Sequence, residues 1–156
     1  MRLAVLLFFT VGILGCGGST GGTYVGDVVV SNSSQLETWM DYSVIEGNLT
    51  IKTETDSPTN FAWVTLERVT GILTIQSNHR LKSFSLSALQ SVDLALVIKD
   101  NDALINFNME SLRSVGSLGI QFNDVLPDCR AEGLLEALDP PLEESLYVIS
   151  DNGGPC

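Results

Sequence analysis

Few residues in this chain have the types and spacing that catalysis or metal binding requires. His79 is the single histidine among 156 residues, so a metal site with two imidazole ligands cannot form. Cys129 and Cys156 lack the close spacing of zinc-binding cysteines. The chain also lacks a phosphate-cradling glycine loop and a nucleophile elbow. The sequence therefore predicts no catalytic residue, no metal centre and no cofactor.

One group of carboxylates leaves an alternative open. Asp100 and Asp102 flank Asn101, and Asp93 and Asp124 stand within reach in the neighbouring segments. Oxygen ligands of this kind suit Ca²⁺. We expect an ordinary solvated loop here, with a weak calcium corner as the alternative.

The first residues have the pattern of an export signal. Arg2 precedes an apolar run over residues 3–13, which is too short to remain in a bilayer as a spanning helix. The run ends at Ile13-Leu14-Gly15-Cys16, which resembles the lipobox of bacterial lipoproteins. The resemblance implies that residues 1–15 are a signal peptide and that Cys16 carries the lipid. The alternative is an ordinary signal peptide with a cysteine near its end.

The cysteine count supports lipidation. The chain has three cysteines, and exported proteins seldom leave one unpaired. Lipidation of Cys16 leaves Cys129 and Cys156 as a pair that can form a disulfide. Residues 16–26, rich in Gly, Ser and Thr, are expected to be a flexible tether. Gly17 stands where an aspartate would signal inner-membrane retention, so the resemblance implies anchoring to the bacterial outer membrane or cell surface.

Composition limits the partners. The net charge is −11, from 19 acidic and 8 basic residues, and this balance disfavours nucleic acid and anionic lipid as ligands. With 44% apolar residues, the chain is long enough for one domain with its own core.

The elements that would position any site come from a repeat of about 23 residues. Leucines recur at gaps of 24, 23 and 22, and an isoleucine follows each leucine two places later: Leu49, Leu73, Leu96 and Leu118, with Ile51, Ile75, Ile98 and Ile120. Phenylalanines form another column at Phe61, Phe84 and Phe107, and valines close the units at Val69, Val92 and Val115. A period of this length is typical of a solenoid, and the alternation within each unit predicts stacked parallel strands. We expect a mainly β chain with short capping helices over residues 27–156, in about four to five coils.

An asparagine follows three of the strands. Asn78, Asn101 and Asn123 each stand three residues beyond the isoleucine of their unit. A buried asparagine at a turn can satisfy backbone groups of its own coil and of the adjacent one. These residues are therefore predicted to form a structural corner rather than a ligand site.

Both ends of the solenoid need covering, because an open coil exposes its core and strand edges. Ser34 and Glu37 have the spacing of a capping box, which predicts a helix over residues 35–42. Asp128 is expected to cap a second helix over residues 129–138, followed by a strand over residues 146–149. A Cys129–Cys156 disulfide would fasten the tail across this second cap.

The repeated units resemble the receptor L domain, the right-handed β-solenoid module of insulin- and epidermal-growth-factor-type receptor ectodomains. The resemblance rests on Val44-Ile45-Glu46-Gly47-Asn48-Leu49-Thr50-Ile51, on the later Leu-x-Ile-x-x-Asn-x-x-Leu segments and on the closing Leu-x-x-Val pairs. It implies a non-catalytic recognition or structural module at a cell surface, binding an unknown protein or glycan. The alternative is a carbohydrate-active β-helix enzyme or its accessory subunit.

The outward strand positions are the candidate contact residues of such a module. They are polar and lack a row of aromatic rings. They also include no acidic residue, which together with the small number of coils argues against the enzyme. The candidates are Thr50, Lys52, Thr74, Gln76, Lys99 and Gln121.

Overall fold

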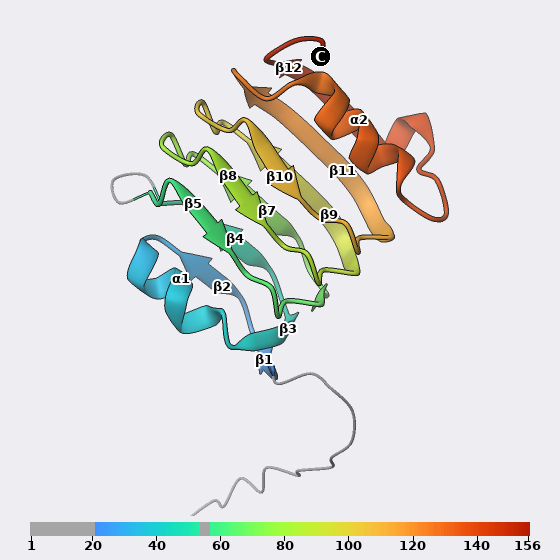
Figure 1. Cartoon of the computed structure of the whole chain (residues 1–156). Helices are drawn as coiled ribbons and strands as arrows, with labels where there is room; N and C mark the ends of the chain where they lie inside the picture. The colour runs from blue at the N-terminus through green and yellow to red at the C-terminus, as the bar shows by residue number, and fades with distance from the viewer. Residues whose placement is uncertain (1–20, 54–56) are drawn as a thin grey trace, which may run out of the picture.

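The computed structural model of the chain describes residues 21–53 and 57–156 and shows a β-solenoid whose coils are stacked from the β1 end to the C-terminus (Figure 1). The predicted mainly β fold of stacked coils with capping helices is confirmed. The strands are β1 Gly22–Val25, β2 Val28–Val30, β3 Tyr42–Glu46, β4 Leu49–Ile51, β5 Asn60–Ala62, β6 Arg68–Val69, β7 Leu73–Gln76, β8 Ser83–Ser85, β9 Ser91–Lys99, β10 Asn106–Asn108, β11 Ser114–Asn123 and β12 Tyr147–Asn152. The helices are α1 Ser33–Trp39 and α2 Asp128–Glu136, and a 3₁₀ turn spans Glu144–Leu146.

Each coil has three sides, built by two parallel sheets. The nine-stranded sheet covers two sides, because the long strand β9 pairs with β6 through its first residues and with β7 through its last ones. The third side is the sheet β5-β8-β10. In chain order α1 follows β2 just as β5 follows β4, and α2 follows β11 just as β10 follows β9. The two helices therefore take the place of the third side's strand in the first and last coils (Figure 1).

The repeated side chains form continuous columns in the core. Leu49, Leu73, Leu96 and Leu118 are direct register partners across β4, β7, β9 and β11, and the four isoleucines two places later are aligned in the same way. All eight side chains are buried. Each buried aliphatic side chain contributes roughly 1.5–3 kcal/mol, so these columns are the main source of stability. Ile45 begins the valine column by pairing with Val69, which the sequence pattern did not reveal.

The corner asparagines form a hydrogen-bonded ladder that runs through the stack. Asn78 Nδ2 donates to Asn101 Oδ1 at 2.9 Å, and Asn101 Nδ2 donates to Asn123 Oδ1 at 3.1 Å. Asn123 Nδ2 continues the ladder to Asn152 Oδ1 at 3.0 Å, so the ladder has a member that the sequence reasoning missed. At the other end, Thr53 donates to Asn78 Oδ1 through both its N–H and its hydroxyl group.

Each ladder asparagine also serves the backbone. The amide nitrogens of Asn78, Asn101, Asn123 and Asn152 donate to the carbonyl oxygens of Ile51, Ile75, Ile98 and Ile120. Asn78, Asn101 and Asn123 are buried. The ladder therefore satisfies polar groups that have no access to water, as a buried turn requires.

The helices begin earlier than the sequence predicted. Helix α1 starts at Ser33, and its N-cap is Asn32, whose side chain accepts a 2.9 Å hydrogen bond from Gln35 N. The expected capping box at Ser34 and Glu37 is wrong, because asparagine is as good a cap as serine and Asn32 stands two residues after the end of β2. Helix α2 starts at Asp128, so the expected N-cap role of Asp128 is also wrong.

The expected tether over residues 16–26 is wrong in its last part. Gly22–Val25 forms β1, which pairs in parallel with β3 and so extends the folded unit beyond its predicted start at residue 27. Tyr24 packs its ring against Trp39 and Tyr42, with centroid distances of 4.7 and 5.7 Å. This aromatic cluster holds an otherwise small and polar segment in place.

The predicted disulfide is confirmed. Cys129 at the start of α2 is bonded to Cys156 in the tail that follows β12, with 5.9 Å between their Cα atoms. Asp128 N donates to Gly154 O at 2.8 Å, so a backbone hydrogen bond joins the same two segments. The tail is thereby fastened to the helix that closes the last coil.

Candidate binding surface

The outer face of β2, β4, β7, β9, β11 and β12 carries two rows of aligned side chains. One row consists of register partners with small or β-branched side chains, namely Val29, Thr50, Thr74, Val97, Gly119 and Val148. Val29 is 59% exposed and Val148 is 51% exposed. This β-branched row is therefore an accessible, uncharged stripe across the stack.

The second row lies beside it, two residues further along each strand. Gln76 pairs with Lys99, Lys99 with Gln121 and Gln121 with Ser150. Lys52 directly follows β4, next to Gln76. Gln121 Nε2 donates to Ser150 Oγ at 3.0 Å, and Lys99 Nζ lies 3.9 Å from Asp100 Oδ2. The six candidate residues of the sequence analysis thus lie on one face, in two adjacent rows.

A hollow interrupts the β-branched row at Gly119. It has a volume of about 290 Å³, and its walls include Val97, Leu146, Tyr147 and Val148. A Cβ placed on Gly119 would meet no atom within 4 Å, so the missing side chain leaves open space. Gly119 is an outward strand position, but the hollow depends on the 3₁₀ turn that brings Leu146 over β11.

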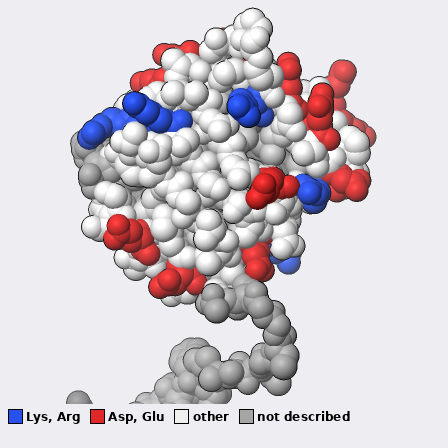
Figure 2. Space-filling model, viewed as in Figure 1, with Lys and Arg blue, Asp and Glu red and all other residues white. Residues whose placement is uncertain are grey.

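The third side has a larger hollow of about 510 Å³ that no sequence motif indicated. Its lining residues are all uncharged: Asn60, Phe61, Ala62, Ser83, Phe84, Ser85, Asn106 and Asn108. In the space-filling view, most charged side chains lie toward the margin of the molecule, and a broad uncharged area lies between them (Figure 2). The alternation around Phe61 and Phe84 was the available signal, because it places the small polar neighbours on the outside.

The acidic residues do not gather into a metal site. Asp93 pairs with Arg68 at 2.6 Å, and Asp102 lies 2.8 Å from His79 Nδ1. Asp100 faces Lys99 instead. Within residues 21–53 and 57–156, no group of three or more His, Cys, Asp or Glu residues is placed to hold an ion. The structure therefore separates the carboxylates that the calcium alternative requires.

Among the residues that the structure describes, Asp27 and Arg68 have shifted pKa values, and each shift has a local cause. The pKa of Asp27 is held below its ordinary value because its carboxylate accepts hydrogen bonds from the backbone and side chain of Asn48, at 2.8 and 3.1 Å. The pKa of Arg68 is raised by its hydrogen bonds to Asp93 and by the charge of that carboxylate. Both pairs join successive coils at the surface, so their role is in the scaffold.

The expected signal peptide of residues 1–15 and the expected lipidation residue Cys16 lie outside the described residues. In the part of the chain that the structure describes, no helix has the length and apolar character needed to cross a membrane.

Comparison with known proteins agrees with the geometry. A search of curated proteins finds no match. The sequence model of the receptor L domain matches residues 43–131, which span the chain from β3 into α2. The match and the stacked parallel strands lead to the same assignment: the chain belongs to the receptor L domain family.

Proposed function

We propose that this protein is a non-catalytic recognition module that binds a protein ligand through the outer face of β4, β7, β9, β11 and β12. Receptor L domains are ligand-binding domains without catalytic activity, which supports the general class. The hollow beside Gly119 carries the assignment to this face, because its aliphatic walls adjoin a row of polar side chains. A ligand with one projecting apolar side chain and hydrogen-bonding groups beside it would complement both features.

The charge of this face favours a neutral or acidic ligand surface. The chain has 8 Lys and Arg residues, and Lys52 and Lys99 both stand in the polar row. Neither of the two rows contains a carboxylate. Complementary charges at an interface raise the association rate and fix the orientation more than they raise affinity. We therefore expect binding to weaken as salt concentration rises.

The test blocks the hollow without disturbing the fold. Gly119→Arg adds a long side chain where a Cβ meets nothing within 4 Å, so the melting temperature should not change. Full-length protein in detergent is used to capture ligands from the envelope of the source cells, and affinity is then measured with the purified ligand. Gly119→Arg should weaken binding by about tenfold or more. Ala62→Arg, exposed on the third side, is the control and should bind normally.

Two outcomes would contradict the proposal. One is a ligand that binds wild-type protein and Gly119→Arg equally well. The other is a ligand that only Ala62→Arg fails to bind, which would move the contact surface to the third side. That side is the second candidate, since the neutral Asn and Ser side chains of its hollow suit a polar uncharged ligand such as a glycan.

We further propose that the module is anchored to the bacterial outer membrane or cell surface through lipid on Cys16. The lipobox-like sequence before Cys16 supports this location. Because β1 begins at Gly22, five residues separate the lipidated cysteine from the fold, and an extended chain of that length reaches about 18 Å at most. The β1 end of the solenoid would then lie close to the membrane, with the contact face available along its side.

A further inference from the structure

The phenylalanine column of the third side ends abruptly. Phe61, Phe84 and Phe107 stack with centroid distances of 5.5 and 5.7 Å and with interplanar angles of 12° and 17°. Phe61 and Phe84 are buried, but Phe107 is only partly buried. In the next coil α2 replaces the strand, so no fourth ring follows Phe107 in the stack.

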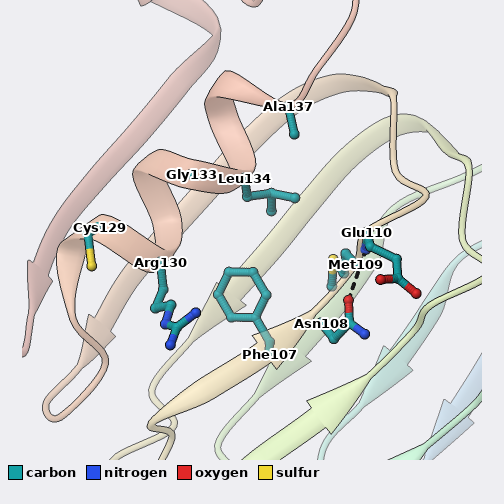
Figure 3. Close-up of a pocket in the computed structure, with 9 residues that line it drawn as sticks. All are labelled: Phe107, Asn108, Met109, Glu110, Cys129, Arg130, Gly133, Leu134 and Ala137. Atoms are coloured by element: carbon teal, nitrogen blue, oxygen red, sulfur yellow. Dashed lines mark hydrogen bonds between the residues drawn. The ribbon is translucent and has the colours of Figure 1, made fainter.

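A cavity of about 220 Å³ lies where that fourth ring would be (Figure 3). Phe107 projects from β10 toward α2, and Met109, Leu134 and Ala137 supply further apolar lining. Gly133 of α2 also lines the cavity, and a Cβ on it would meet no atom within 4 Å. An engineered cavity of about 150 Å³ is already large enough for benzene, so this space accepts one aromatic ring.

Two unpaired charges flank the cavity. Arg130 lies on one side of the Phe107 ring and Glu110 on the other (Figure 3). Across residues 21–53 and 57–156, neither side chain makes an ion pair or a side-chain hydrogen bond. The side-chain nitrogen of Asn108 is likewise unused, because only its oxygen bonds, to Glu110 N at 3.0 Å. The rim thus offers both donors and acceptors around an apolar floor.

We infer that this cavity, defined by Phe107, Arg130 and Gly133, is a binding site for an aromatic side chain of a polypeptide ligand. The ring would stack on Phe107 and continue the column at a spacing near that of the three existing rings. Arg130 would lie against the ring, where a guanidinium is attracted to the aromatic face. Donors and acceptors on the rim would meet the peptide groups on either side of the aromatic residue.

The size of the cavity favours a side chain over a larger ligand. Sites for drug-sized molecules usually have about 300–1,000 Å³, which is more than this cavity holds. The neutral balance of Arg130 and Glu110 also suits uncharged peptide groups better than a charged small molecule. This site lies between β10 and α2, away from the face of β4, β7, β9, β11 and β12. An experiment that disproves one of the two binding sites therefore leaves the other untouched.

The test uses full-length protein in detergent with ¹³C-labelled methyl groups. The probe is N-acetyl-phenylalanine amide, and the matched control is N-acetyl-cyclohexylalanine amide, which has a similar shape but no π system. Stacking on Phe107 should shift the methyl resonances of Met109, Leu134 and Ala137 in a saturable way. The aromatic probe should bind about three- to tenfold more tightly than its saturated analogue. Benzyl alcohol serves as a free aromatic ring without peptide groups.

Two variants locate the site. Gly133→Leu fills the cavity and should weaken binding of the probe about tenfold or more. The melting temperature should not fall, because leucine favours a helix interior more than glycine does. Gly119→Leu fills the hollow on the other face and should bind the probe as wild type does. Equal binding of the saturated analogue, or unchanged binding to Gly133→Leu, would overturn the inference. Binding of benzyl alcohol without binding of the capped amino acid would overturn the assignment to a polypeptide.

Discussion

At the scale of single residues, the asparagine ladder imposes an unusual backbone on its neighbours. Ser77, Asp100, Phe122 and Asp151 have φ values of 54°, 52°, 55° and 55°, and each stands directly before a ladder asparagine. The left-handed conformation turns the chain so that the next side chain points into the corner. Asp is tolerated in this conformation, whereas an ordinary L residue is disfavoured by roughly 1–2 kcal/mol. The backbone conformation is therefore least favourable at Phe122, because phenylalanine disfavours a positive φ more than aspartate does.

Replacing Phe122 should stabilise the protein. Phe122→Asn removes an aromatic side chain that is 49% exposed and introduces a residue that accepts positive φ. We expect the free energy of unfolding to rise by about 0.5–1 kcal/mol, measured in urea. Phe122→Leu is the matched control and should show no such gain, because leucine gains nothing at positive φ. A loss of stability in Phe122→Asn would mean that the ring makes a larger packing contribution than its exposure suggests.

The ladder itself should be most sensitive in its middle. Asn101→Ala removes the side-chain oxygen that accepts hydrogen bonds from the backbone N–H and from the side-chain nitrogen of Asn78, which is buried. Each buried donor that loses its partner in this way costs about 1–3 kcal/mol, so stability should fall by roughly 2–6 kcal/mol. Asn152→Ala, at the partly buried end of the ladder, should cost less because water can replace the lost bonds. Equal losses in urea unfolding would show that the ladder does not act through burial.

The Asp27–Asn48 contact predicts a pH effect of known sign. The folded pKa of Asp27 is below its unfolded value, so the contact stabilises the fold above the unfolded pKa and is lost as pH falls through the folded pKa. Asp27→Asn should therefore lose less stability than wild type when the pH is lowered from 7 to about 3. Thermal melts across this range test the difference. Parallel curves for the two proteins would rule out a contribution from this carboxylate.

At the scale of elements, the two ends of the solenoid are closed by different means. Helix α1 covers the first coil by burying Leu36 and by packing Trp39 against Tyr24. Helix α2 buries Ala131 and Leu134 but leaves the cavity beside Phe107, and the Cys129–Cys156 disulfide holds the tail to it. The C-terminal closure thus depends on a covalent link more than the N-terminal one does.

Removing the disulfide should weaken this end. The bond joins residues 27 positions apart, and a loop of that length contributes about 3–4 kcal/mol by restricting the unfolded chain. The Cys129→Ser, Cys156→Ser double variant should be less stable by that order in urea, while reducing agent should not affect it further. Mass spectrometry of the unreduced wild-type protein should find no free thiol on either cysteine. Two free thiols would disprove the bond.

At the scale of the whole molecule, the solenoid separates structural groups from accessible ones. The columns and the ladder occupy the interior, whereas the β-branched row, the polar row and the third-side hollow lie outside. The same outward positions recur in every coil, so their side chains can vary without disturbing the core. This division explains how a scaffold can present a contact surface without a catalytic group.

The proposed anchor has a direct test. Cys16→Ser should prevent lipid attachment, so labelled palmitate should not be incorporated and the protein should leave the membrane fraction. The fold should be unchanged, because Cys16 precedes the first strand. Membrane association of Cys16→Ser equal to wild type would exclude this anchor.

Much of the architecture was predictable because each coil needs apolar side chains at the same positions. The leucine, isoleucine and phenylalanine columns appear at nearly constant intervals, and the structure aligns them as direct register partners. The sequence pattern did not reveal Asn152, because α2 lengthens the last coil. Asn152 therefore follows Asn123 by 29 residues instead of the usual interval of about 23. The pattern did not reveal strand β1 either, because Gly22 and Thr23 are typical of a flexible segment. Only their pairing with β3 makes this segment a strand.

The sequence by itself determined the stacking, since a side chain that recurs once per coil can be buried only against its own copies in the coils on either side. It also determined that the outward positions of β4, β7, β9 and β11 carry small and polar groups. Only the tertiary structure decided where those groups leave space. The hollow at Gly119 requires the turn at Leu146, and the cavity at Phe107 requires a helix where a strand would have added another ring. A cavity forms where segments that are distant in sequence meet without filling the space between them. A repeat pattern describes the side chains of each coil, but not how such segments meet.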